Sequence, residues 1–355
     1  MLRAVYHRKE GACMTDSPNT RGSSPKNKWF QYSLGFLISG ALIVWLIFAI
    51  EWRLVVRQMT QVHYIWFVPF SLGFLLQMFF RAERWRYLLP ETEQQPSRLM
   101  YYDGIFVGNF INYILPLRLG ELARPFFLSQ RSSFSFPTIF VSVIIERFVD
   151  VSFVLVSFGI MSMYIKNIPT WIHRGAFVFT LISGGIFLFI VLASMLPNHI
   201  LKLARVFFRY LPERLSTPLE NFLVDFLAGA KVVSRPKNFL GVTIYSLILW
   251  IVAFAQYWSL LYMFPNLTFT YWHGVAITVL IALAIAAPSA PGFIGVYQVS
   301  CIAGFLLFGW DKERATTYAI ISHMLQYLIV ILYGLSILFR YDLTLKDLQK
   351  PSEPE

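Results

Sequence analysis

The sequence has few charged residues and almost no cysteine. Only 14% of its 355 residues are charged, and its two cysteines, Cys13 and Cys301, cannot form a disulfide framework. Its six histidines show no metal-ligand spacing. Neither a phosphate-binding loop motif nor a nucleophile elbow is present. These absences argue against the common nucleotide-dependent, metal-dependent and serine-hydrolase enzymes, and we expect no cofactor and no bound metal.

Both ends of the chain are polar. Residues 1–28 are basic and contain no apolar segment, so we expect a disordered cytoplasmic tail rather than a cleavable signal peptide. Met14 is an alternative start. Residues 341–355 form a second polar tail that is too short for a domain, and we expect it to be cytoplasmic as well.

Hydrophobic residues, in contrast, are abundant. They make up 57% of the chain, and several apolar runs exceed the roughly 18 residues that a membrane-spanning helix needs. The composition therefore predicts a polytopic α-helical membrane protein. The formal net charge of +11 fits cationic loops beside anionic lipid better than a nucleic-acid partner, which we do not expect.

Six apolar segments are long enough to cross a bilayer as helices. They lie at 29–50, 62–80, 137–165, 173–196, 239–264 and 315–339. Two further regions, 103–131 and 272–309, each consist of two short apolar pieces on either side of a proline break. These two regions do not match continuous spans.

The distribution of basic residues predicts the topology. Of the 30 Lys and Arg residues, 23 fall in the tails and in the loops that share a side with them, and six fall in the alternate loops. Because basic loops stay in the cytoplasm, both termini are predicted to be cytoplasmic. Residues 103–131 and 272–309 are then re-entrant hairpins that enter from opposite faces, as irregular backbone surrounded by protein allows. The alternative is that each region forms two short tilted spans, which gives ten crossings.

The order of spans and hairpins repeats along the chain. Residues 29–165 and 173–339 each read span, span, hairpin, span, and they start on opposite sides of the membrane. We therefore predict an all-α transmembrane domain over 29–340, with six full spans and two re-entrant hairpins in an inverted-topology repeat. Residues 198–234 have an apolar face at helical spacing beside a basic face, which predicts amphipathic helices on the cytoplasmic leaflet.

The proline breaks place helix starts near the middle of the membrane. We expect Pro116 to open one short helix and the Pro291–Gly292 break to open the other, with Ser289 as a possible N-cap. The free N–H groups and the positive dipole end of such a helix attract anions. Two helix starts that face a central cavity suit a phosphate headgroup.

Six charged residues lie within predicted membrane segments, where a charge costs a few kcal/mol. Three are on "IIERFVDV", with Glu146 and Asp150 on one helical face and Arg147 about 100° away. The others are Arg118, Glu121 and Arg124. One interpretation is that they pair only to hold the hairpin to the helix. The other is that the arginines bind a lipid phosphate bidentately, while the carboxylates orient them or accept protons.

The segment "RAERWRYLLP" directly follows the second predicted span. It is either a basic anchor at the interface with Trp85 or, through Arg81 and Arg84, a path that guides headgroups to the cavity. His323 and Gln326 lie in the last span, where we expect internal hydrogen bonds rather than a proton relay.

Four motifs in this order resemble the lysylphosphatidylglycerol synthase transmembrane-region family of flippase-like membrane proteins. They are "RAERWRYLL", "NYILPLRLGELAR", "ERFVD" and "PSAPGFIGVYQ", within a resemblance that covers about residues 30–340. The resemblance implies movement of a polar lipid between leaflets, such as an aminoacylated phospholipid or a polyprenyl-linked lipid. It implies functional roles for Asn112, Pro116, Arg118, Gly120, Glu121, Arg124, Glu146, Arg147, Asp150, Pro288, Pro291, Gly292 and Gly295.

Two departures from the family pattern affect the predicted function. The second hairpin motif commonly ends in Glu, whereas this chain has Gln298, which removes a carboxylate that could carry protons. The soluble aminoacyl-transferase domain of the full-length synthases is absent, so we expect no synthase activity.

The sequence thus predicts a lipid translocase of a bacterial inner membrane that moves a phosphate-bearing lipid. One alternative is a membrane-embedded transferase that acts on a lipid-linked substrate. Another is an accessory scaffold that partners an enzyme of envelope-lipid synthesis.

Overall fold

The computed structural model describes most of the chain beyond the N-terminal segment. The described residues are 39–115, 118–164, 196–233, 235–265, 267–286 and 289–343, with scattered positions between 174 and 192. The predicted N-terminal tail, most of the predicted span 173–196 and most of the C-terminal tail lie outside them, as do Pro116 and Pro288. Every regular element in the described part is a helix, in agreement with the predicted all-α class.

Three helices are long and apolar enough to cross a membrane. They are η1 with α3 (Tyr64–Tyr87), α10 (Pro236–Leu261) and α13 (Lys312–Arg340). They correspond to three of the six predicted spans. Their outward residues are apolar, and Leu72, Ile251 and Leu328 are each more than half exposed. These apolar outer surfaces suit contact with lipid tails.

The helix α6 (Phe136–Tyr164) is also long, at 29 residues, but carries three charged residues near its middle. The first described segment differs from a straight span. The helix Ser39–Ala49 is followed by α2 (Trp52–Met59) at an angle of 85°. The predicted loop 51–61 is therefore largely helical, and the Nζ of Lys312 donates a hydrogen bond to the Ala49 carbonyl at the bend.

Both regions predicted as hairpins form pairs of short helices. The first pair is α4 (Arg98–Ile114) and α5 (Gly120–Ser129). The second pair is α11 (Tyr271–Ile285) and α12 (Val296–Leu306), joined through the short turn η2 (Pro291–Phe293). In each pair the two helices pack directly against each other. At about 15 to 25 Å, these helices are shorter than the roughly 30 Å hydrocarbon core.

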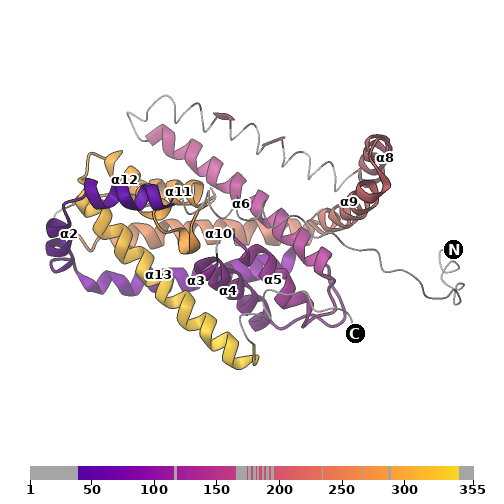
Figure 1. Ribbon diagram of the computed structural model, residues 1–355, viewed down its shortest axis with the longest axis horizontal. Coiled ribbons are helices and arrows are strands. Elements are labelled where there is room, and N and C mark those ends of the chain that lie inside the picture. Colours follow the sequence, from indigo (N-terminus) through magenta and orange to yellow (C-terminus); the bar gives the residue numbers. More distant parts are fainter. Residues whose placement is uncertain are drawn as a thin grey trace, which may run out of the picture.

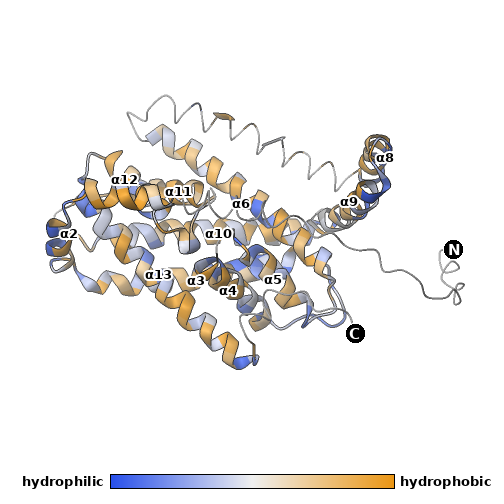
Figure 2. Ribbon diagram, viewed as in Figure 1, coloured by the Kyte–Doolittle hydropathy of each residue, from blue (hydrophilic) through white to orange (hydrophobic). Residues whose placement is uncertain are grey.

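The two helix pairs lie toward different ends of the bundle. Figure 1 shows α4 and α5 near one end, and α2, α11 and α12 at the other, with α3, α10 and α13 running between them. Three buried apolar clusters fill the interior, and the largest surrounds α4 and α5. Figure 2 shows mainly hydrophobic helices, with hydrophilic residues where α4 and α5 lie.

The predicted amphipathic segment forms α8 (Pro197–Phe208) and α9 (Glu213–Val233). The helix α9 packs on α6, because Gly229 lets the two helices approach closely at Val141. The helix α8 buries none of its residues and exposes Leu203, Val206 and Phe207. These helices extend beyond the bundle (Figure 1).

Candidate functional site

A network of charged side chains lies inside the bundle where α3, α5 and α6 meet. The helix α6 contributes Glu146 and Asp150, one turn apart on the same face, and both are buried. The side chain of Glu146 is completely inaccessible. Since a buried carboxylate is costly without compensation, its partners determine whether this arrangement is stable.

Glu146 is the centre of this network. Its Oε1 lies 2.7 Å from the Nη2 of Arg147 and 3.0 Å from the Nη2 of Arg84, and its Oε2 lies 2.7 Å from the Nη2 of Arg124. The Nε of Arg81 is 3.9 Å from Oε1. One carboxylate therefore interacts with four arginines from three helices.

Asp150 interacts with three of the same arginines. The Nη1 of Arg84 donates a hydrogen bond of 2.6 Å to its Oδ1, while Arg147 and Arg81 lie 3.4 Å and 4.0 Å from its Oδ2. Arg84 thus bridges the two carboxylates and is itself fully buried. The interpretation of "RAERWRYLLP" as an interfacial anchor is wrong at this residue, because α3 continues to Tyr87 and turns Arg84 into the core.

A close contact between two glycines positions α5. A Cβ on Gly120 would lie 1.8 Å from the carbonyl oxygen of Gly108, so the two backbones touch and only glycine fits. The Oδ1 of Asn112 accepts a hydrogen bond of 2.8 Å from the Gly120 N–H. A side chain of α4 thus satisfies one free amide at the start of α5.

Arg118 lies in the turn before α5 and has a left-handed backbone, with φ of 54°. This conformation is uncommon outside glycine, and it is held here by the contacts that fix α5. Within the described residues, Arg118 is the one arginine of the site without a carboxylate oxygen inside 4 Å. Its guanidinium lies 5.7 Å from the ring centre of Phe293, which belongs to η2.

A cavity of about 120 Å³ opens onto these residues. Four arginines line it, together with Glu121 as its one carboxylate, two asparagines, and apolar residues that include Phe293. The arginines are Arg81, Arg118, Arg124 and Arg147. The lining is therefore strongly positive, and a group that fills it must be anionic or a strong hydrogen-bond acceptor.

The charges of the site do not balance. Five arginines face three carboxylates, which leaves two positive charges in excess. The buried Nε atoms of Arg81, Arg118, Arg124 and Arg147 have no hydrogen-bond partner among the described residues. An excess of arginine around a cavity is the arrangement expected of a site for phosphate or carboxylate oxygens.

Trp85 was predicted as a possible interfacial residue, and the structure corrects this. Its side chain is completely buried, its ring centre lies 3.6 Å from the guanidinium carbon of Arg124, and its Nε1 donates to the Oγ of Ser142 at 2.9 Å. The ring therefore supports Arg124 by a cation–π contact from the side of the protein core. The sequence gave no sign of this contact, because Arg124 of α5 and Trp85 of α3 meet only in the tertiary structure.

The second helix pair contains no charged side chain in its predicted motif. Gly292 and Gly295 have positive φ values of 65° and 88°, which explains the need for glycine in this turn. The N-cap of α12 is Gly295, whose N–H donates to the Oε1 of Gln298. Pro291 begins the short helix η2 as predicted, but the N-cap of η2 is Ala290, so the prediction of Ser289 as a cap is wrong. Gln298 does not line the arginine cavity.

A neutral hydrogen-bond cluster joins this pair to α10 and α13. The Tyr297 hydroxyl donates to Ser322 at 2.9 Å and accepts from the Nε2 of Gln326 at 3.1 Å, and Gln326 also donates to the Tyr257 hydroxyl. The amide of Gln298 lies 3.1 Å from the Nδ1 of His323. The expected internal hydrogen bonds of His323 and Gln326 are confirmed.

Asp103 is a buried charged residue that the sequence analysis did not single out. Asp103 on α4 is completely buried, and its carboxylate accepts hydrogen bonds from the Tyr333 and Tyr341 hydroxyls and from Arg340. These contacts fix the end of α13 to α4. The signal was available, because Asp103 is an acidic residue at the start of an apolar segment, as Glu146 is within one.

The structure brings most of the predicted site residues together. Asn112, Arg118, Gly120, Glu121, Arg124 and Arg147 line one cavity with Arg81, and Glu146 and Asp150 hold its arginines. Pro116 and Pro288 lie outside the described residues. In the described part of the chain, no group of three or more His, Cys, Asp or Glu side chains could hold a metal ion.

The motifs that form this site are also those of a known family. The lysylphosphatidylglycerol synthase transmembrane region matches residues 32–334. The chain belongs to this family. Among curated proteins, it is 27% identical over 278 residues to the UPF0104 membrane protein PH1989 of Pyrococcus horikoshii, across 71% of this chain and 80% of that protein. No solved structure matches the chain. The family membership places the protein in the membrane.

Proposed function

We propose that the protein is a lipid translocase that moves a phosphate-bearing polar lipid between leaflets. The observation that carries this proposal is the excess of arginine over carboxylate around a cavity within the membrane domain. Intramembrane charges are rare, and they usually mark the path of a polar substrate. A structural network alone needs only as many arginines as its carboxylates can neutralise.

The residues of the site divide into two roles. Glu146 and Asp150 hold Arg84, Arg124 and Arg147 in place, as the short ion-pair distances support. Arg118, which lacks such a partner, is the group best placed to bind a phosphate directly. Arg81 is 3.9 Å and 4.0 Å from its carboxylates, and this loose pairing leaves it able to follow the headgroup.

The helix pairs supply the path. We propose that α4–α5 and α11–α12 are re-entrant hairpins of an inverted repeat, with both termini in the cytoplasm and the protein in a bacterial inner membrane. The short lengths of these helices and the break in each pair support this arrangement. The headgroup passes between the pairs, while the acyl chains stay in lipid beside the apolar outer surfaces.

Lipid movement in proteoliposomes tests the proposal. Fluorescent anionic, aminoacylated and polyprenyl-phosphate lipids are reconstituted with wild type, with Arg118→Gln and with Arg53→Gln. Arg53 is an exposed residue of α2 that does not line the arginine cavity, so its variant is the matched control for loss of one positive charge. We expect loss of transport in Arg118→Gln alone, with normal thermal stability because Arg118 has no ion pair to break.

Two results contradict the proposal. If Arg118→Gln moves every lipid as fast as wild type, the cavity is not the headgroup path. If wild type moves none of the lipids, a transferase or a scaffold role becomes the better explanation of the family domain.

A further inference from the structure

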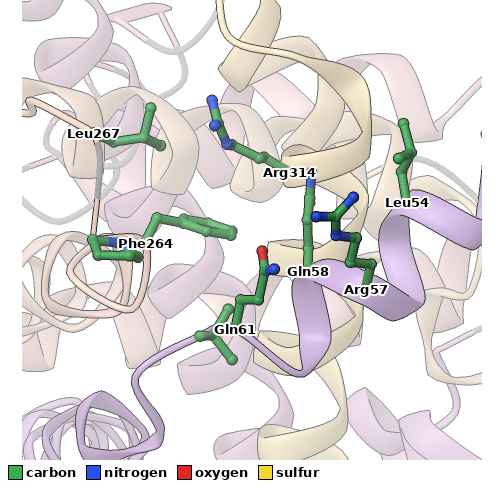
Figure 3. A pocket seen from close by; sticks show the side chains of 9 residues that line it. Leu54, Arg57, Gln58, Gln61, Phe264, Leu267 and Arg314 are labelled. Carbon is green, nitrogen blue, oxygen red and sulfur yellow. The ribbon is translucent and has the colours of Figure 1, made fainter.

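A second polar cavity lies between α2, the segment that follows α10 and the first turn of α13. Its volume is about 230 Å³. Four polar residues line it, Arg57, Gln58, Gln61 and Arg314, next to apolar residues that include Leu54 and Phe264. Figure 3 shows Gln58 on α2, Gln61 in the turn just after α2, and Arg314 on another helix around the same space. None of these residues belongs to the motifs discussed above.

This cavity is separate from the arginine cavity. Arg314 lies in the first turn of α13, about 20 Å along the helix before Tyr327. The Tyr327 hydroxyl donates to the carbonyl of Tyr113, on the last turn of α4 beside the arginine cavity. The cavity thus lies toward the end of the bundle that holds α2 and α12 in Figure 1, while α4 and α5 lie toward the other.

The charge of the second cavity is positive. Two guanidinium groups from different elements line it, and no carboxylate lines it among the described residues. Asp311 neutralises Arg314 at 3.0 Å from outside the lining. Arg57 has no carboxylate within 4 Å in the described part of the chain, so one positive charge remains uncompensated.

The other lining residues suit a phosphate attached to an apolar chain. The Oε1 of Gln58 accepts a hydrogen bond from Thr317 at 3.1 Å, which leaves its amide N–H groups free to donate. Gln61 adds a second amide. Leu54, which is 41% exposed, adds an apolar surface to the cavity wall. A mixed lining of this type contacts the phosphate and the adjoining glycerol of a lipid at once.

We propose that this cavity binds the phosphate group of an anionic lipid at the end of the bundle opposite the arginine cavity. The two arginines carry the assignment of a phosphate site. A further role for this cavity, as the second binding site of the transported headgroup, rests on the proposed function. Translocation from one end of the bundle to the other then has a binding site at each end.

Counting bound lipids tests the assignment. Phosphatidylglycerol is titrated into the full-length protein in dodecyl maltoside micelles, which contain no phosphate, and bound lipids are counted by native mass spectrometry. We expect two tightly bound lipids in wild type. Arg57→Gln and Arg314→Gln should each weaken binding of one of them by at least about tenfold, because a charged hydrogen bond is lost. Arg53→Gln, on the same helix but outside the cavity, should bind both.

The arginine cavity is tested in the same experiment. Arg118→Gln should weaken binding of the other lipid, so the two sites are counted separately. If only the Arg57 and Arg314 variants lose a lipid, the second site stands while the proposed translocation path fails. If Arg57→Gln and Arg314→Gln both bind as wild type does, the second site is overturned.

Two further probes define the ligand. Diacylglycerol lacks the phosphate, and if it binds this cavity as tightly as phosphatidylglycerol does, the cavity does not recognise phosphate and the proposal is overturned. Inorganic phosphate at millimolar concentration separates the sources of the anion. If it displaces the lipid that depends on Arg57, free phosphate is a ligand of the site. If it does not, the site requires the lipid.

Discussion

The two pairs of short helices both have a buried polar network beside them, but the two networks differ in chemistry. Around α4–α5, arginines and carboxylates form a buried ionic network with Glu146 at its centre. Around α11–α12, tyrosine, glutamine, serine and histidine side chains form a neutral network. The ionic network keeps unpaired donors beside a cavity, whereas most donors of the neutral network are used within the protein. This difference supports the proposal that the first pair binds the headgroup, whereas the neutral network of the second pair joins helices to one another.

The largest loss of stability is expected when the central carboxylate of the ionic network is removed. Glu146→Gln leaves Arg84, Arg124 and Arg147 without their shared charge partner, and a buried pair broken in this way costs about 3–5 kcal/mol. We expect a large loss of thermal stability of the purified protein, measured by scanning fluorimetry in detergent. A variant as stable as wild type would show that the arginines are neutralised by other groups.

The closeness of helix packing within the two pairs can be compared by replacing one glycine of each pair with alanine. Gly120→Ala places a Cβ against the Gly108 backbone at 1.8 Å, whereas in Gly304→Ala the nearest atom is the flexible Cγ1 of Ile277 at 3.1 Å. Overpacking costs about 1–3 kcal/mol where the neighbour cannot move. Gly120→Ala should therefore lower the melting temperature clearly more than Gly304→Ala. Equal shifts would mean that α5 can move away from α4 without penalty.

Removing the Tyr297 hydroxyl tests how much the neutral network contributes to stability. Tyr297→Phe removes the partner of Ser322 and Gln326, but Gln326 keeps its hydrogen bond to Tyr257. We expect a loss of about 1 kcal/mol in the free energy of unfolding, measured by denaturant titration. A loss as large as that of Glu146→Gln would contradict this comparison, because the neutral network would then contribute as much to stability as the ionic one.

The smallest effect is expected outside both pairs, at an exposed contact between Glu91 and Lys237. The Nζ of Lys237 donates a 2.6 Å hydrogen bond to Glu91, and this bond lowers the pKa of the Glu91 carboxyl. Because the pKa is lower in the folded state, the contact stabilises the protein above the ordinary glutamate pKa of about 4.3, and this contribution is lost as the pH falls through the lowered pKa.

Lys237→Gln should therefore cause a slight drop in melting temperature near pH 7, which shrinks as the pH falls through the lowered pKa of Glu91. Melting curves of wild type and variant over a series of decreasing pH values measure the difference. A gap that widens on acidification would contradict this assignment.

The sequence predicted the elements of the fold better than their contacts. Apolar length alone located α3, α10 and α13, and the proline breaks located both pairs of short helices. It did not predict that α3 extends to Tyr87, because "RAERWRY" is basic and the rule for basic loops placed it at the interface. The buried Arg84 of this segment pairs with Glu146 and Asp150 of α6, which are distant in the sequence.

For the site, the sequence supplied the charged residues and the structure supplied their partners. Helical spacing placed Glu146 and Asp150 on one face, since that depends only on local geometry. The role of Trp85 beneath Arg124 and the burial of Asp103 depend on which helices pack together. The cap of α12 also differs from the expected Ser289, since Gln298 reaches back to Gly295 from inside the helix.

Phe293 belongs to the turn of the uncharged pair, yet it forms part of the wall of the arginine cavity. The position of this ring therefore depends on the turn of the second helix pair and also affects the shape of the arginine cavity. A ligand that binds more tightly when the ring is displaced must shift the conformational equilibrium of the Pro291–Phe293 turn. By thermodynamic reciprocity, a substitution that favours one position of that turn changes the affinity for the ligand by the same factor.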